Sequence, residues 1–167
     1  MAMNEAAKQW VAALRSGEYQ QCQSALRKEI DGRPHFCCLG VANEMSGMGQ
    51  WIDPACGIFQ DEAQLRATEA NIAELVAEYG EESDEDAEIL KSEEFTSPMV
   101  QEWLGLDAED GELEINGERT SLARLNDAGK TFAEIADIIE QHADQLFSQG
   151  HHESMTAPTN PKTDTGT

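Results

Sequence analysis

The sequence predicts a single, helix-dominated α+β domain in which one or two small antiparallel β-hairpins pack on helices. Three observations predict it: helical apolar stripes near both ends of the chain, two turn signals between short strand-like runs, and a length of 167 residues. That length is typical of one domain and is enough to bury a core without disulfides or metals. We expect the domain to cover residues 1–148, and a disordered Thr- and Pro-rich tail to cover 149–167.

The N-terminal part of the chain predicts a helix followed by a hairpin. Asn4 is a suitable N-cap for the helix and Gly17 a suitable end. The apolar face of this helix consists of Ala7, Trp10, Val11 and Leu14. Two short candidate strands, 25–30 and 35–38, flank the letters DGRP, whose Asp-Gly and proline are typical of a turn. The chain then enters a helix near Leu39, which the letters SGMG end.

The middle of the chain has a less regular pattern. Residues 49–66 combine a candidate strand, GQWID, with the loop-like letters PACGIF. Residues 68–79 predict a helix capped by Thr68. Residues 81–94 carry eight Asp or Glu and one Lys, which is typical of a solvated, mobile insertion. This stretch lacks the glycine of an EF-hand loop, so we expect no dedicated calcium site.

Capping residues and a second turn organise the C-terminal part. Ser97, Pro98 and Gly105 are the residue types that cap, begin and end a short helix. The letters GELEINGERTSL predict a second hairpin with Asn-Gly in a type I′ turn. After a short helix, SLARLNDAG, Thr131 and Glu134 form a capping-box pattern that opens a final amphipathic helix. The apolar stripe of that helix consists of Phe132, Ile135, Ile138, Ile139 and Leu146.

The charge of the chain limits its partners. The net charge is −22, from 11 basic and 33 acidic side chains, which disfavours direct binding to nucleic acids and to anionic membranes. Basic proteins and divalent cations are the electrostatically natural partners. The N-terminus lacks an apolar export signal, and the longest apolar run, FCCLGVA, is too short to span a bilayer. We therefore expect a cytoplasmic protein whose four cysteines stay reduced, and the oligomeric state stays open.

The segment HFCCLGVANEM raises two chemical alternatives. In a thiol enzyme, His35 and Cys37 would share one strand face, with Asn126 or Asp127 orienting the base. The candidate zinc ligands are Cys22, His35, Cys37, Cys38 and Cys56. Adjacent cysteines on a strand point to opposite faces, which disfavours a shared metal ion. Because the surrounding run is apolar, we expect Cys37 and Cys38 to be small core residues, without a metal or another cofactor.

Four blocks of the sequence occur in order over residues 9–140: QWVAALRSGEY, FCCLGV, PMVQEWLGL and LARLNDAGKTFAEIADIIE. Together they resemble a family of small phage and prophage proteins of unknown function. The resemblance implies an origin in a phage or another mobile element and a cytoplasmic setting in the host cell. It implies no activity for any residue. The acidic stretch 81–94 lies between the blocks.

These observations predict a non-catalytic, phage-type accessory protein that acts by binding. Its acidic surface would bind a basic host protein, such as a defence or nucleic-acid-binding protein, in the manner of a DNA-mimic inhibitor. The candidate partner-binding residues are Glu81, Glu82, Asp84, Glu85, Asp86, Glu88, Asp107, Glu109 and Asp110. A solvated acidic loop without a partner also explains residues 81–94.

Two other functions remain open at this point. One is a thiol-dependent enzyme that uses Cys37 or Cys38 with His35. The other is a protein that sequesters a small ligand, such as a nucleotide, in a pocket between the two terminal blocks. Thiol reactivity would distinguish the first alternative, and ligand-dependent stabilisation would distinguish the second.

Overall fold

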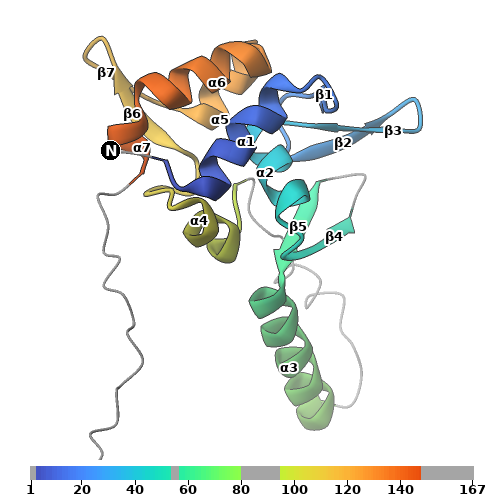
Figure 1. The fold of residues 1–167 in the computed structure, drawn as a ribbon. Coiled ribbons are helices and arrows are strands. Elements are labelled where there is room, and N and C mark those ends of the chain that lie inside the picture. The colour runs from blue at the N-terminus through green and yellow to red at the C-terminus, as the bar shows by residue number, and fades with distance from the viewer. Residues whose placement is uncertain (1–2, 54–56, 80–94, 148–167) are drawn as a thin grey trace, which may run out of the picture.

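Helices from the two ends of the chain lie side by side at the centre of the domain (Figure 1). The residues that the computed structural model describes are 3–53, 57–79 and 95–147. The helices are α1 (Glu5–Arg15), α2 (Cys38–Ser46), α3 (Glu62–Tyr79), α4 (Pro98–Leu104), α5 (Leu122–Asp127), α6 (Phe132–Gln141) and α7 (Ala143–Leu146). The strands are β1 (Gln20–Gln21), β2 (Arg27–Ile30), β3 (Arg33–Phe36), β4 (Gly49–Asp53), β5 (Ile58–Asp61), β6 (Glu112–Ile115) and β7 (Glu118–Ser121). This arrangement confirms the predicted helix-dominated α+β class.

The core lies where α1 meets α2 and α6, and where α5 meets α2 and α6. The predicted apolar face of α1 is confirmed, because all of its members are buried: Ala7, Trp10, Val11 and Leu14. On α6, Phe132, Ile135 and Ile139 are buried and Ile138 is half-buried. The stripe predicted for one final helix is divided between two helices. The backbone of His142, with φ −114° and ψ 24°, is not helical and separates α6 from α7. Leu146 lies on α7 and is buried there.

Both predicted hairpins form around two-residue turns with positive φ. The first turn is Asp31-Gly32, with φ values of 53° and 74°, and the second is Asn116-Gly117, with 53° and 83°. The expectation that all four letters DGRP form the turn is wrong, because Pro34 lies within β3. In this hairpin register, the backbone nitrogen of Pro34 points away from β2. Although proline has no N–H, no hydrogen bond between β2 and β3 is lost.

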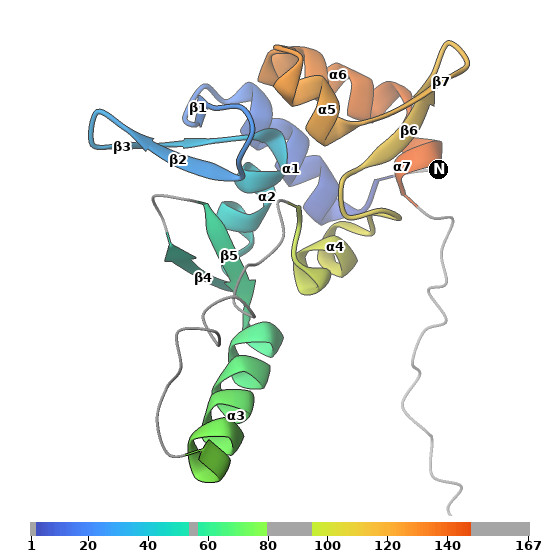
Figure 2. The same cartoon turned by 180° about the vertical axis from the view of Figure 1, so that it is seen from behind.

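The hairpins belong to three small sheets in the described part of the chain. β3 is the central strand of the first sheet, with β2 antiparallel on one side and β1 parallel on the other. The β4–β5 pair is joined to this sheet by aromatic rings. The ring centroid of Trp51 lies 5.9 Å from that of Phe36 on β3 and 5.1 Å from that of Phe59 on β5. β6 and β7 form the third sheet, on the opposite side of the domain from the β2–β3 hairpin (Figure 2).

The predicted helix caps are confirmed at three helices. The Oδ1 atom of Asn4 accepts a hydrogen bond from Ala7 N at 2.8 Å and opens α1. Ser97 caps α4 by accepting from Val100 N, and the predicted capping box of α6 forms between Thr131 and Glu134. These caps satisfy amide groups that have no partner within their own helices.

The start of α3 differs from the prediction. The helix begins at Glu62, not near Thr68, and the final letters of PACGIF belong to strand β5, not to a loop. The cause is a reciprocal cap: Asp61 Oδ1 accepts from Gln64 N at 2.9 Å, and Gln64 Oε1 accepts from Asp61 N at 3.0 Å. This is a capping box built with an aspartate and a glutamine. From it, α3 projects away from the rest of the domain (Figure 1).

Asp61 also caps a second helix, which predicts a measurable effect of its removal. The buried carboxylate accepts from Met99 N at 3.1 Å through its second oxygen, so it links the starts of α3 and α4. Asp61→Ala is expected to lower the free energy of unfolding by about 2 kcal/mol, because two helix starts lose their acceptor. Chemical denaturation measures this loss. Asp61→Asn keeps one acceptor oxygen and should lose clearly less; equal losses would contradict the capping role.

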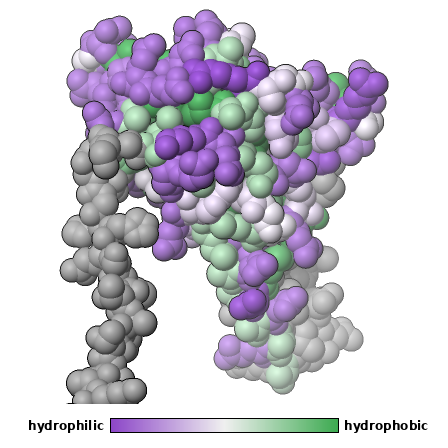
Figure 3. Space-filling view, viewed as in Figure 1, coloured by the Kyte–Doolittle hydropathy of each residue, from purple (hydrophilic) through white to green (hydrophobic). Residues whose placement is uncertain are grey.

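Two predicted segments, the acidic stretch 81–94 and the tail 149–167, lie outside the described residues. Within the described residues, no helix combines the length and the apolar composition that crossing a bilayer requires. The surface over α6, α1 and the β6–β7 hairpin is largely hydrophilic (Figure 3). The described members of the predicted partner-binding set, Asp107, Glu109 and Asp110, lie in the loop between α4 and β6.

Candidate functional site

The first candidate site is an acidic face formed by the loop 105–111 and strand β6. Its members share an exposed or half-buried carboxylate, and we call them the hairpin face: Asp107, Glu109, Asp110, Glu112 and Glu114. Three of them belong to the predicted partner-binding set. The other six predicted residues, Glu81, Glu82, Asp84, Glu85, Asp86 and Glu88, lie outside the described residues.

Backbone contacts hold the loop of the hairpin face in place. Gly105 ends α4 with a φ of 71°, and Leu106 is buried directly after it. Asp107 N donates to Leu146 O at 2.9 Å, which ties the loop to α7. Glu109 O accepts two hydrogen bonds from the buried Thr96, one from its amide and one from its hydroxyl. The carboxylates therefore project from a backbone that is fixed on both sides.

A side chain that the sequence pattern did not indicate fixes strand β6. Gln145 on α7 donates to Glu114 O at 3.2 Å, and its amide oxygen accepts from Glu114 N at 2.8 Å. The side-chain amide thus pairs with the outer edge of β6 as a neighbouring strand would. Gln145 follows β6 by about thirty positions in an exposed stretch, so no local signal in the sequence reveals this contact.

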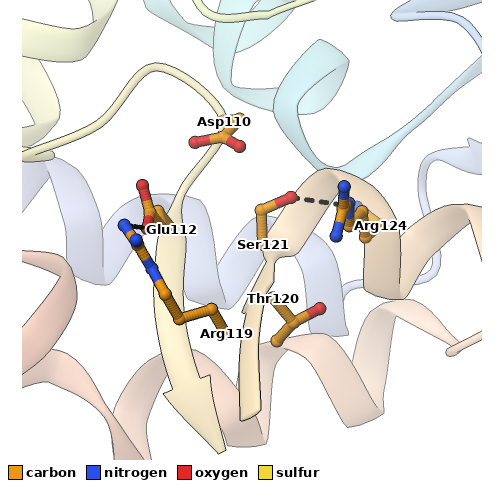
Figure 4. A pocket seen from close by; sticks show the side chains of 6 residues that line it. All are labelled: Asp110, Glu112, Arg119, Thr120, Ser121 and Arg124. Atoms are coloured by element: carbon orange, nitrogen blue, oxygen red, sulfur yellow. Dashed lines mark hydrogen bonds and ion pairs between the residues drawn. The ribbon is translucent and has the colours of Figure 1, made fainter.

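Two neighbouring cavities, each of about 320 Å³, open on the hairpin face. The lining of the first cavity is Asp110, Glu112, Arg119, Thr120, Ser121 and Arg124 (Figure 4). The lining of the second is Asp107, Ala108, Glu112, Leu113, Glu114, Arg119 and Gln145. Glu112 and Arg119 line both cavities and form an ion pair with each other. The first cavity balances two carboxylates with two guanidinium groups, whereas the second has three carboxylates and one guanidinium group.

The second candidate site is the pair Cys37 and Cys38. Their predicted burial is confirmed, since Cys37 is 5 % exposed and Cys38 is fully buried. The prediction that strand 35–38 includes both cysteines is wrong, because β3 ends at Phe36 and α2 begins at Cys38. Cys37 is the N-cap of α2, and its Sγ atom accepts from Gly40 N at 3.3 Å.

The expected pair of His35 and Cys37 does not form a hydrogen bond in the described residues. The Nδ1 atom of His35 lies 3.1 Å from Arg33 O, while the sulfur of Cys37 faces the amides of α2. Cys38 contacts two helices, α5 and α1. Cys38 Sγ lies 3.5 Å from Leu122 O of α5, and Cys38 O accepts from Trp10 Nε1 of α1 at 2.9 Å.

The two expected orienting residues, Asn126 and Asp127, hold the backbone of this region instead of a catalytic base. Asn126 Oδ1 accepts from Cys38 N at 3.2 Å, and Asn126 Nδ2 donates to Cys22 O at 2.8 Å. Asp127 Oδ1 accepts from Ser24 N at 2.7 Å. The letters LND of the last block therefore contact the segment around FCC, although they lie far apart in the sequence.

The local environment shifts the pKa values of the three described cysteines in different directions. A hydrogen bond from the Cys38 thiol, together with the amides of Gly40 and Leu39, lowers the pKa of Cys37. The same contact with Cys37, together with burial, raises the pKa of Cys38 well above its usual value. Burial raises the pKa of Cys22 to about 11. Among the three described cysteines, Cys37 is therefore the one whose pKa is lowered.

The other proposed chemistries have less support in the described residues. No group of three or more His, Cys, Asp or Glu among them is arranged to hold a metal ion, and Cys56 lies outside this part of the chain. A depression of about 410 Å³ lies between the segment 21–30 and Gly129, close to where a pocket between the terminal blocks is expected. Lys28 is the cationic side chain in its lining, and Gln21 in that lining is already bonded to Asn126 and Lys130 O.

Comparisons with known proteins give one match. A family model described as "Domain of unknown function (DUF8296)" matches residues 3–143. No curated protein and no solved structure matches the chain.

Proposed function

The chain belongs to this family of domains of unknown function, and we propose that it is a non-catalytic binding protein whose hairpin face binds a basic protein. The observation that carries this proposal is the second cavity. Its three carboxylates, from Asp107, Glu112 and Glu114, exceed the single guanidinium group of Arg119. Glu112 is paired with Arg119, and a Lys or Arg side chain of the partner would contact the exposed carboxylate of Glu114.

The charge of the whole chain supports the same class of partner. A net charge of −22 produces a negative field that attracts basic proteins over a distance of about one Debye length and accelerates their encounter. The same field repels phosphate backbones and anionic lipids. The hairpin face adds a shaped site to this general attraction, and a shaped site is what distinguishes specific binding from charge alone.

The rigidity of the hairpin face supports a binding role. Leu113 of β6 is buried in the core, Gln145 holds the outer edge of the same strand, and Thr96 holds the preceding loop. Side chains on such a fixed backbone lose less conformational freedom when a partner binds. The face is therefore suited to a partner whose basic groups have a fixed spacing.

The finer part of the proposal concerns the kind of partner. Spaced carboxylates on a rigid face can occupy a basic groove that normally holds nucleic-acid phosphates. A defence or nucleic-acid-binding protein of a host cell presents such a groove. The resemblance of the four sequence blocks to phage proteins supports this setting, with the host cytoplasm as the location and residues 81–94 as a second acidic element.

Neutralising two of the three carboxylates that line the second cavity tests the proposal. Asp107→Asn with Glu114→Gln is expected to weaken binding to a basic probe protein, such as a histone, by about tenfold. Both changes preserve side-chain shape and leave the Glu112–Arg119 pair intact. The affinity is measured by isothermal calorimetry at low salt and repeated at about 0.15 M and 0.5 M salt, where it should fall.

A matched variant separates the site from total charge. Glu29→Gln with Asp31→Asn removes the same charge from the exposed β2–β3 hairpin, on the opposite side of the domain (Figure 2). Asparagine tolerates the positive φ of position 31. This control should weaken binding by less than about threefold. Equal losses in the two variants would show that only bulk charge matters, and the hairpin face would then not be the site.

A further inference from the structure

The parallel pairing of β1 with β3 brings two cysteines together. The register pairs Gln20 with His35 and Gln21 with Phe36, so Cys22 and Cys37 are the next two residues in line. Cys22 N donates to Phe36 O at 2.8 Å, a hydrogen bond of the Gln21–Phe36 pair that places Cys22 beside the peptide bond between Phe36 and Cys37. Neighbouring strands lie about 4.8 Å apart and paired residues point to the same face. A Cα separation of that size lies within the range of disulfide bonds.

The sulfur of Cys37 is prepared to act as a nucleophile. It faces the first amides of α2, where the partial positive charge of the helix N-terminus stabilises a thiolate. Hydrogen bonds from the Cys38 thiol and from two backbone amides lower the pKa of Cys37. Burial raises the pKa of Cys22, and the negative charge of a Cys37 thiolate raises it further.

A small cavity borders Cys37. Its volume is about 50 Å³, and its lining is Ser24, Ala25, Cys37, Phe95, Ala123 and Asp127. A water molecule needs about 10–15 Å³ of such space, so the volume of this cavity is sufficient for hydrogen peroxide. Cys22 lines a neighbouring depression, and Ser24 belongs to the lining of both hollows.

We propose that Cys22 and Cys37 form a reversible redox pair that a hydroperoxide converts to a disulfide. The Cys37 thiolate attacks the distal peroxide oxygen, the O–O bond breaks, and the leaving oxygen takes a proton to give water or an alcohol. The product at Cys37 is a sulfenic acid. The Cys22 sulfur then attacks the Cys37 sulfur, the S–O bond breaks, and the hydroxyl leaves as water with the Cys22 proton. Two thiols are oxidised and one peroxide is reduced.

Cys38 is not the partner in this bond. Its thiol is fully buried and lies against Leu122 O on the core side of α2. The same contact with Cys37 that lowers the pKa of Cys37 raises that of Cys38 well above its usual value, so Cys38 stays a thiol. The disulfide would withdraw the Cys37 sulfur from Gly40 N and join β1 covalently to the start of α2, so oxidation changes the contacts at a helix start.

Intact mass and peptide mapping after treatment with hydrogen peroxide test the pair. The folded full chain with Cys56→Ser is expected to lose the mass of two hydrogens, and digestion should give a cross-linked peptide joining Cys22 to Cys37. A thiol reductant should reverse both changes. Absence of the cross-link at a peroxide dose that oxidises the denatured chain would overturn the proposal.

Single variants in the same background assign each sulfur. Cys22→Ser should gain oxygen on Cys37 without losing hydrogens, and Cys37→Ser should form no disulfide. Serine is a good N-cap, so Cys37→Ser is expected to fold, which circular dichroism checks. Cys38→Ser should still form the Cys22–Cys37 bond. If Cys22→Ser still loses two hydrogens, the bond joins Cys37 to Cys38, and the proposed pair is wrong.

Discussion

Replacing Trp10 by alanine is expected to lower the free energy of unfolding by about 3–5 kcal/mol, because it removes the largest of the fully buried side chains. Trp10 lies on α1, where that helix meets α2 and α6. Alanine would leave a cavity among side chains that cannot fully close around it. The loss is measured by urea denaturation followed by far-ultraviolet circular dichroism.

Trp10→Phe separates the packing of the ring from its hydrogen bond. The indole N–H donates to Cys38 O at 2.9 Å, and this hydrogen bond is buried. Phenylalanine keeps much of the apolar contact but leaves that buried carbonyl without this donor, so the expected loss is about 1–2 kcal/mol. Losses of equal size for phenylalanine and alanine would mean that the hydrogen bond, not the ring volume, dominates.

The burial of Trp10 is predictable from the sequence because the reason for it is local. The helical period places Trp10 on one stripe with Val11 and Leu14, and burial follows from that stripe. The caps at Asn4 and Ser97 are predictable for the same reason, since a cap depends on residues within three positions. Where two local signals compete, the prediction is wrong: Thr68 is a plausible cap, yet the box formed by Asp61 starts α3 earlier.

The remaining contacts could not be predicted because they join distant parts of the chain. The parallel strand β1 is two residues long and has no hydrophobic alternation. Nothing in its own sequence predicts a strand, and it forms by pairing with β3. The predicted strand extends through Cys37 and Cys38 because periodicity alone does not distinguish a strand from a buried helix in an apolar run of this length. Which one forms is decided by the contacts of Cys38 with Trp10 and Leu122.

The candidate site is predictable in part. The acidic composition around residues 107–110 indicates a partner-binding surface, and Asp107 and Asp110 do line the two cavities. The cavities themselves require Arg119 from β7 and Gln145 from α7 beside that loop. Their positions follow from the packing of the hairpin on α7, which composition and spacing do not encode.

Asn126→Ala is expected to lower the free energy of unfolding by about 2–4 kcal/mol, because one buried amide serves several partners. It satisfies Cys38 N and Cys22 O and also accepts from Gln21 Nε2 at 2.9 Å. Alanine would leave these groups without this partner and would open a small cavity beside α2. Gln21→Ala removes only the half-buried partner and should lose less than about 1 kcal/mol, as urea denaturation would show.

The variant Asn126→Asp keeps the size of the side chain. It therefore tests whether the accepting oxygen or the donating nitrogen of the amide contributes more to stability. A carboxylate still accepts from Cys38 N, but it cannot donate to Cys22 O and is buried with its charge. Burial and the facing carbonyl raise the pKa of the new aspartate in the folded state, so the folded state binds more protons than the unfolded state. The stability of this variant should therefore fall as the pH rises from about 5 to 7 and recover on acidification, unlike that of Asn126→Ala. If both variants respond to pH in the same way, the Cys22 carbonyl does not depend on the donor that Asn126 provides.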